Sequence, residues 1–180
     1  MTIPTDKVLI QAVFAGKKEA FGELYDRYAP LVRAVCYDKT DNLADAQDLA
    51  QDVFLRAYER LGRLSEPDKF GRWLIGIARL RCKEWQRQKI RSREKSAGPA
   101  NTETYISESS NDGHIEKLRE MIMKLPEKER LAVHTFYLLD GSADEARNIM
   151  GLSRSGFYRV LERARKRLGD YLVQEWEVIP

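Results

Sequence analysis

Hydrophobic residues recur at intervals of three and four along most of the first 90 positions, which is the spacing of one helix face. A short first helix is predicted for residues 6–15, and three longer apolar stripes follow within residues 21–36, 46–61 and 70–85. No segment shows the convincing alternation of polar and apolar residues that a half-buried strand would need. Because three amphipathic helices can bury their apolar stripes against one another, the pattern predicts a compact helical bundle.

The composition changes after residue 93. Residues 95–113 are rich in Ser, Asn, Thr, Glu and Gly, contain Pro99, and have almost no apolar residues. Such a segment cannot bury enough surface to fold alone. The helical spacing of apolar residues resumes at Ile115. The chain is therefore predicted to be all-α, with two small helical domains at 1–93 and 115–180 joined by a flexible linker at 94–114.

Within the second domain the sequence predicts a helix-turn-helix. Ser142 and Glu145 stand at the N-cap and N3 spacing of a capping box, in which each residue satisfies the other's backbone N–H. Gly151 supplies the left-handed residue that ends such a helix. Ser153 can then cap a second helix, whose apolar stripe begins at Phe157.

The polar face of this second helix is strongly basic, with Glu162 as its one acidic residue in residues 154–167. A helix of this kind can enter a major groove, with its first turn on base edges and later cations near phosphates. The alternative is an ordinary solvated face on an all-α domain, but the tight turn and one-sided charge favour DNA binding. We expect Phe157 in the core, and the predicted DNA contacts are Arg154, Ser155, Tyr158, Arg159, Arg163 and Lys166.

Charge is segregated along the chain, although the net charge of the 180 residues is only +3. Acidic residues gather within 38–52, and basic residues gather within 72–95 and after 154. Segregation of this kind suggests two partner surfaces, one facing a basic partner and one facing nucleic acid.

The cysteines and the absence of targeting signals both bear on where in the cell the protein is expected to act. Cys36 and Cys82 are isolated in sequence and fall on apolar stripes, so we expect buried thiols of a reducing cytosol rather than a disulfide or metal pair. The sequence shows no signal peptide and no long apolar run, which predicts a cytoplasmic protein without membrane insertion.

The sequence shows no residue pattern typical of a catalytic site. His114 falls in the predicted linker, and His134 has no second ligand or base at metal or triad spacing. No glycine-rich phosphate loop occurs, and no nucleophile stands beside an activating base. We therefore expect no enzymatic activity, no metal site and no cofactor.

The third predicted helix has an acidic polar face opposite its apolar stripe. A solvated face explains most such patterns, but here carboxylates exceed cations by more than pairing within the helix requires. An acidic face with little internal neutralisation can dock a basic helical partner. The residues of this predicted docking face are Asp45, Asp48, Gln51, Asp52 and Arg56.

A short loop at 62–69 precedes a basic fourth helix that also carries Trp73 and Trp85. Cations interleaved with aromatic residues suit opened nucleic acid, because cations pair with phosphates and aromatic rings stack on unpaired bases. Helical spacing nevertheless places both tryptophans more readily in the core. The basic face then remains as a surface that follows the nucleic-acid backbone.

Four motifs in this order resemble those of the extracytoplasmic-function sigma factors, the smallest members of the bacterial sigma-70 family. They are DLAQDVFLRAY at 48–58, FGRWLIGIAR at 70–79, LPEKER at 125–130 and LERARKRL at 161–168. The chain departs from the family pattern at a few positions. Leu80 and Glu84 replace the usual Asn and Asp, Arg147 replaces Ala, and Gly156 and Val160 replace Thr and Arg.

The resemblance implies a promoter-recognition subunit. Region two would bind a coiled coil on the largest subunit of core RNA polymerase through the acidic face, and would open the minus-ten element by capturing an extruded base. Region four would read the minus-thirty-five element and contact the polymerase flap. An anti-sigma factor or another signalling protein would regulate it. The implied minus-ten contacts are Arg63, Ser65, Lys69, Arg72, Arg79, Lys83 and Arg87.

A second interpretation stays open at this point. The chain could be a helix-turn-helix transcription regulator with a helical interaction domain at its N-terminus. A regulator of that kind needs no acidic docking helix followed by a basic helix that carries aromatic residues. The first domain is therefore the feature that favours the sigma factor.

Overall fold

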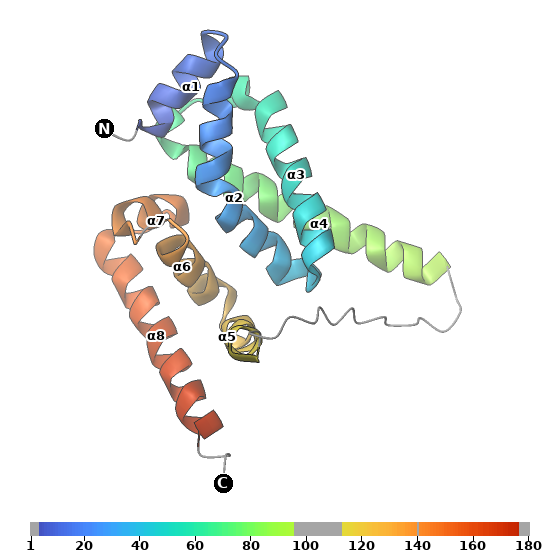
Figure 1. Cartoon of the computed structure of the whole chain (residues 1–180), viewed down its shortest axis with the longest axis vertical. Helices are drawn as coiled ribbons and strands as arrows, with labels where there is room; N and C mark the ends of the chain where they lie inside the picture. Colours follow the sequence, from blue (N-terminus) through green and yellow to red (C-terminus); the bar gives the residue numbers. More distant parts are fainter. Residues whose placement is uncertain (1–3, 96–112, 140, 177–180) are drawn as a thin grey trace.

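The computed structural model describes residues 4–95, 113–139 and 141–176. These residues are almost entirely helical and contain no strand, so the predicted all-α class is confirmed (Figure 1). Most of the predicted linker, residues 96–112, lies outside the described residues. Helices occupy the ends of the predicted linker on both sides, and His114 belongs to the helix that begins at Gly113.

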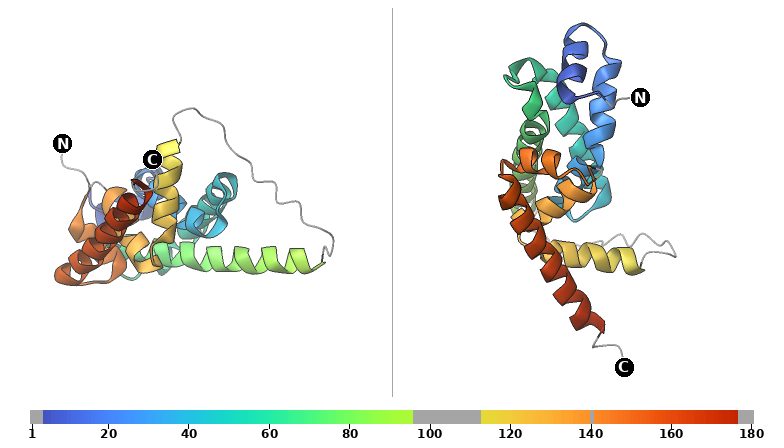
Figure 2. Two further views of the ribbon diagram at one scale, coloured as in Figure 1. Left: turned by 90° about the horizontal axis from the view of Figure 1, so that it is seen from below. Right: turned by 90° about the vertical axis from the view of Figure 1, so that its left-hand side faces the viewer.

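The first group of helices contains four α-helices and two short 3-10 turns, and its fourth helix projects well beyond the bundle (Figure 2). These elements are α1 (Asp6–Phe14), α2 (Glu19–Thr40), α3 (Leu43–Glu59), η1 (Leu61–Arg63), η2 (Pro67–Lys69) and α4 (Phe70–Lys95).

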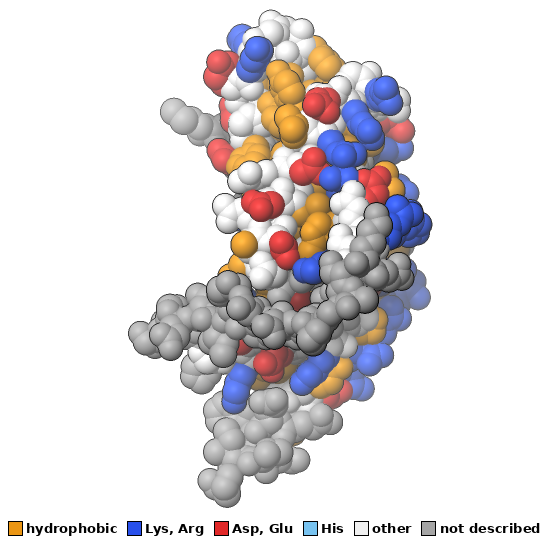
Figure 3. Space-filling model, turned by 90° about the vertical axis from the view of Figure 1, so that its right-hand side faces the viewer, with side chains coloured by type: hydrophobic (Ala, Val, Ile, Leu, Met, Phe, Trp, Pro, Cys, Tyr) orange, Lys and Arg blue, Asp and Glu red, His pale blue; other side chains and the backbone are white. Residues whose placement is uncertain are grey.

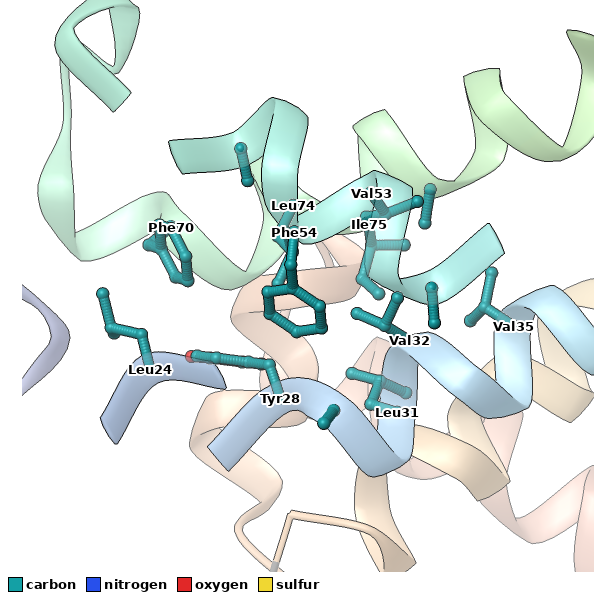
Figure 4. Packing of buried hydrophobic residues seen from close by; sticks show 14 of the residues in the cluster. Leu24, Tyr28, Leu31, Val32, Val35, Val53, Phe54, Phe70, Leu74 and Ile75 are labelled. Atoms are coloured by element: carbon teal, nitrogen blue, oxygen red, sulfur yellow. The ribbon is translucent and has the colours of Figure 1, made fainter. Parts of the chain in front are cut away.

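Helices α2, α3 and α4 each contribute one apolar face to a common core (Figure 4). Complete burial of a large apolar side chain contributes about 1.5–3 kcal/mol to stability, so this core is the main source of stability in the first group. Its central residues are Leu24, Tyr28, Leu31, Val32, Val53, Phe70 and Leu74, each no more than 1% exposed.

The second group contains the predicted helix-turn-helix. Ser142 Oγ accepts a hydrogen bond from Glu145 N at 3.2 Å, Gly151 ends the first helix with a φ of 64°, and Ser153 Oγ accepts from Gly156 N at 3.1 Å. Phe157 is fully buried, as expected. The helices of this group are α5 (Gly113–Lys124), α6 (Glu127–Tyr137), α7 (Ala143–Met150) and α8 (Arg154–Trp176).

The predicted capping box forms only by half. Ser142 N donates to Leu139 O at 3.1 Å, and the Glu145 carboxylate instead accepts a hydrogen bond from Tyr28 Oη of α2 at 2.9 Å. A side chain from the first group therefore replaces the local partner that the sequence predicted for Glu145.

The two groups pack against each other, with α6 beside α2 and α7 beside α4 (Figures 1 and 2). Leu131, Leu139 and Ile149 of the second group join the hydrophobic cluster of the first. Gly71 of α4 permits this approach, because a Cβ there would lie 2.9 Å from both Ile149 Cγ1 and Tyr28 Cε1. The contact therefore includes shared hydrophobic packing as well as polar pairs.

A nearly buried ion pair lies at the same contact. Asp38 Oδ2 of α2 accepts a hydrogen bond from Arg130 Nε of α6 at 2.6 Å, and Asp38 Oδ1 lies 3.1 Å from His134 Nε2. Arg130 also donates to the carbonyl oxygens of Met123 and Leu125, which fixes its guanidinium. Removing one member of such a pair leaves an uncompensated buried charge, so the pairing makes this contact specific.

We predict that Gly71→Ala lowers the free energy of unfolding by about 1–3 kcal/mol, because the new methyl group overpacks the ring of Tyr28 and the side chain of Ile149. Gly22→Ala is the matched control in α2, where a Cβ meets nothing within 4 Å. It should raise stability by about 0.5–1 kcal/mol, since alanine favours helix. Urea unfolding checks both, and equal effects of the two substitutions would contradict the close approach at Gly71.

Candidate nucleic-acid interface

A cavity of about 550 Å³ lies between the loop before α4 and the first three turns of α4. Trp73, Ile77 and Leu80 supply apolar surface to it. Three of the predicted minus-ten residues, Ser65, Lys69 and Arg72, also line it. A base can stack on an aromatic or apolar surface while cations pair with the adjacent phosphates, so the lining suits an unpaired nucleotide.

The apolar lining is the part of this cavity that sequence reasoning missed. Trp73 was expected in the core, and it does pack against Phe70 with ring centroids 6.0 Å apart, but it also lines the cavity. Positions 73, 77 and 80 follow helical spacing, so a second stripe beside the core stripe was the available signal. Trp85 packs against the core as expected, with Lys89 Nζ 4.4 Å from its ring centroid.

The remaining predicted minus-ten residues lie elsewhere. Arg63 of η1 and Arg87 of α4 are exposed and do not line the cavity. Arg79 and Lys83 line a second cavity, of about 280 Å³, together with Glu127 of α6. Arg79 Nη2 lies 3.4 Å from the Glu127 carboxylate. The predicted set is therefore divided between two cavities along α4 and two exposed positions.

Arg72 also meets the second group of helices. A Cβ built at Gly151 would lie 3.0 Å from the Arg72 guanidinium carbon, so this cation sits against the turn of the helix-turn-helix. Glu127 of α6 pairs with Lys39 of α2 at 3.5 Å as well as with Arg79. Cations of the predicted minus-ten set thus face the second group in this arrangement.

The acidic face of α3 is partly neutralised by α4. Asp48 and Gln51 are exposed, but Asp45 pairs with Lys89 at 3.3 Å and Arg56 lies 3.9 Å from Glu84. On the face that includes α3, side chains of both signs lie next to one another (Figure 3).

Asp52 of the predicted docking face is engaged by cations within the protein. Asp52 is half-buried and pairs with Arg56 at 3.4 Å and with Arg81 of α4. Burial of Arg81 opposes its charged form, but hydrogen bonds to Asp52 and Glu84 outweigh burial and raise the pKa of Arg81. The sequence pattern gave the acidic face of α3 but could not show which cations of α4 would meet it.

The basic face of α8 is exposed as predicted. Two of its arginines are nevertheless held by α6, because Arg163 Nε lies 3.6 Å and Arg167 Nε 3.0 Å from the carboxylate of Glu129, which is buried. The six predicted contacts, all exposed, are Arg154, Ser155, Tyr158, Arg159, Arg163 and Lys166.

Two further properties hold for the residues that the structure describes. No group of three or more His, Cys, Asp or Glu side chains among them is placed to hold a metal ion. No helix within the described ranges combines the length and the apolar character needed to cross a membrane.

Comparisons with known proteins identify the family. The profile of Sigma-70 region 2 matches residues 24–92. The ECF RNA polymerase sigma-E factor of Escherichia coli K12 is 30% identical over 176 residues, which cover 88% of this chain and 91% of the relative. SigW, the ECF RNA polymerase sigma factor of Bacillus subtilis 168, is 29% identical over 181 residues, which cover 91% of this chain and 97% of SigW.

The chain belongs to the extracytoplasmic-function sigma factors. As a sigma factor it acts in transcription initiation and is not an enzyme, and the alternative of a separate helix-turn-helix regulator is set aside.

The fold of this sigma factor is that of solved relatives. The structure of CnrH in complex with the cytosolic domain of CnrY superposes with a TM-score of 0.66 at 21% identity, over 94% of this chain and 97% of CnrH. RpoE in complex with the anti-sigma factor NepR, from Bartonella quintana, gives a TM-score of 0.51 at 20% identity, over 89% of this chain and 98% of RpoE. Both comparisons cover both groups of helices.

For this sigma factor we predict that Asp52→Ala lowers the free energy of unfolding by about 1–2 kcal/mol, because it leaves the half-buried Arg81 with one carboxylate fewer. Asp48→Ala, on the exposed part of the same helix, should change stability by less than about 0.5 kcal/mol. Chemical denaturation of the two variants checks this, and equal stability would mean that the ion pair between Asp52 and Arg81 contributes nothing.

Proposed function

We propose that this sigma factor directs RNA polymerase to promoters through three surfaces on two domains. Residues 1–93 form region two, which binds core polymerase and the minus-ten element. Residues 115–180 form region four, which binds the minus-thirty-five element, and residues 94–114 join the two domains as a flexible linker. The protein acts in the cytoplasm, where its polymerase and its promoters are found.

The cavity beside α4 is the observation that carries the minus-ten assignment. Extruding a base costs a few kcal/mol in lost stacking and pairing, and a binding pocket must offset that cost. Stacking on an aromatic ring contributes about 1–3 kcal/mol per base, and Trp73 offers such a ring within the cavity lining. Arg72 lines the cavity where a neighbouring phosphate would lie, and Lys69 lines it as well, paired with Glu66 at 2.7 Å.

Leu80 gives this cavity its own selectivity in our proposal. The family usually has Asn at this position, whereas Leu80 is half exposed and lines the cavity with an apolar side chain. An apolar side chain offers no hydrogen bond to a base edge, so base selection here depends on shape and stacking. The preferred minus-ten sequence should therefore differ from that of relatives with Asn.

The exposed face of α8 supports the minus-thirty-five assignment. Arg154 and Arg159 lie in its first turns, where side chains can reach base edges in a major groove. Lys166 lies further along, where phosphates or the polymerase flap are the expected partners. Arg163 is held by Glu129, so it presents a fixed charge to the backbone.

Asp48 and Gln51 are the exposed residues of the predicted docking face, so we assign the polymerase coiled coil to them first. Asp45, Asp52 and Arg56 contribute by holding α3 on α4. An interfacial pair between unlike charges is worth about 1.5–7 kcal/mol when the two charges are close.

Promoter binding requires the two domains to separate in our proposal. Arg72 and Arg79 are engaged by region four in the packed arrangement, so they cannot all contact DNA until it moves away. The solved structures of CnrH and of the Bartonella RpoE each contain a second protein, CnrY and the anti-sigma factor NepR. We propose that an anti-sigma factor or another signalling protein likewise sets the balance between packed and separated domains here.

Mixed with core polymerase, the chain should start promoter-specific transcripts without another sigma factor, and sequencing those transcripts would define the promoter. The double variant Asp48→Lys, Gln51→Lys should lower affinity for core at least tenfold, because it places cations on the docking face. Glu23→Lys makes a comparable charge change on exposed α2 and should bind core normally. Loss of core binding in the control alone would contradict the assignment of α3.

Arg159→Ala should cost about 1–3 kcal/mol in promoter affinity and relax base preference at one minus-thirty-five position. Lys166→Ala should weaken binding evenly across sequences. It should also reduce the slope of the logarithm of the binding constant against the logarithm of salt concentration by about one. Titrations at several salt concentrations with mutated promoters separate the two roles. Indistinguishable effects would show that the reading face of α8 lies elsewhere.

Glu127→Lys should separate the domains, because it sets a cation against Lys39 and Arg79. Energy transfer between dyes on α1 and α8 should fall, and affinity for single-stranded minus-ten DNA should rise severalfold. Lys128→Glu, at the neighbouring exposed position, serves as the control and should change neither measurement. Domain separation without a gain in DNA affinity would mean that region four does not mask the minus-ten surface.

A further inference from the structure

Two buried cysteines from different helices meet inside region two. Cys36 of α2 and Cys82 of α4 are 0% and 1% exposed, and both are free thiols. Their sulfurs lie 3.9 Å apart and share a hydrogen bond, although the residues are 46 positions apart in sequence. The sequence predicted buried thiols rather than a disulfide pair, and it did not predict their contact.

The surroundings of Cys82 differ from those of Cys36. Cys82 lines the cavity of about 280 Å³, whereas Cys36 is not part of that lining. Three cations line the same cavity, as do two carboxylates. They are Lys39, Arg79 and Lys83, and Asp38 and Glu127. A space of this size holds several water-sized molecules, so a small neutral oxidant can come close to Cys82 from this side.

The two thiols also differ in their pKa shifts, and this difference again favours reaction at Cys82. The hydrogen bond that Cys82 shares with Cys36, together with the charge of Lys39, lowers the pKa of Cys82 against the opposing effects of burial and of Asp38. The same pairing, together with burial, raises the pKa of Cys36. The thiolate is the nucleophile in thiol oxidation, so Cys82 is the sulfur that reacts first.

We propose that Cys36 and Cys82 form a dithiol that hydrogen peroxide oxidises to an intramolecular disulfide between α2 and α4. The Cys82 sulfur attacks one peroxide oxygen, the O–O bond breaks, and the departing hydroxide takes the Cys82 proton to give water. Cys36 then attacks the resulting sulfenic acid, the S–O bond breaks, and the S–S bond forms. The hydroxyl leaves with the Cys36 proton as a second water, so two thiols lose two electrons to one peroxide.

Formation of the bond requires the sulfurs to close from 3.9 Å to ~2.05 Å. The product ties α2 to α4 beside Arg79 and Lys83, in the wall that region two shares with region four. Closing a loop of this length restricts the unfolded chain, so the oxidised protein should be more stable than the reduced protein. The proposal does not depend on the promoter assignments above.

The test uses the full chain, reduced, freed of reductant and treated with hydrogen peroxide under native conditions. Peptide mass spectrometry without reduction should find the peptides of Cys36 and Cys82 joined in a monomer, and the Tm should rise by several degrees. Dithiothreitol should reverse both changes. Thiols that stay reduced while glutathione in the same tube is oxidised would overturn the proposal, as would disulfides formed only between molecules.

Single variants test the order of attack. In Cys36→Ala, the sulfenic acid on Cys82 has no partner and should be trapped by dimedone as a stable adduct. In Cys82→Ala, Cys36 should remain unlabelled at the same peroxide concentration. Labelling of Cys36 rather than Cys82 would overturn the assigned order. Circular dichroism confirms that each variant is folded, and the disulfide in the unsubstituted chain is measured independently of either variant.

Discussion

The hydroxyl of Tyr28 joins three parts of this sigma factor at one buried point. It lies 2.6 Å from Asp6 Oδ2 of α1 and 2.9 Å from Glu145 Oε1 of α7, while its own ring lies in the core of α2, α3 and α4. Burial and the two carboxylates raise the pKa of Tyr28 far above its usual range, so the hydroxyl keeps its proton. The packing of region four on region two depends on this residue and on the absence of a side chain at Gly71.

That packing explains why the predicted DNA-binding residues do not form one surface. Arg79 points to region four because Glu127 offers it a carboxylate, and Arg72 lies against the turn at Gly151. The face of α8 remains exposed in the same arrangement. Under the proposed function, the packed chain would present its minus-thirty-five surface while part of its minus-ten surface is covered, so domain separation would affect promoter choice.

Internal pairing also limits the surface offered to the polymerase. A helix that carries several carboxylates can use some of them to hold its neighbour and leave others for a partner. Here Asp52 meets Arg81 and Asp45 meets Lys89, whereas Asp48 stays exposed. Mutations along one acidic face should thus separate into those that weaken the fold and those that weaken docking.

The sequence by itself determined the helices, the helix-turn-helix caps at Ser142, Gly151 and Ser153, and the exposed basic face of α8. Those features depend on neighbours within a few residues, and local spacing records them. The tertiary structure alone decided that Glu145 bonds Tyr28 rather than its own helix start, that Trp73 lines a cavity, and that Cys36 meets Cys82. Each of these joins helices that are far apart in sequence, and the helical period shows which face a residue occupies but not what lies opposite that face.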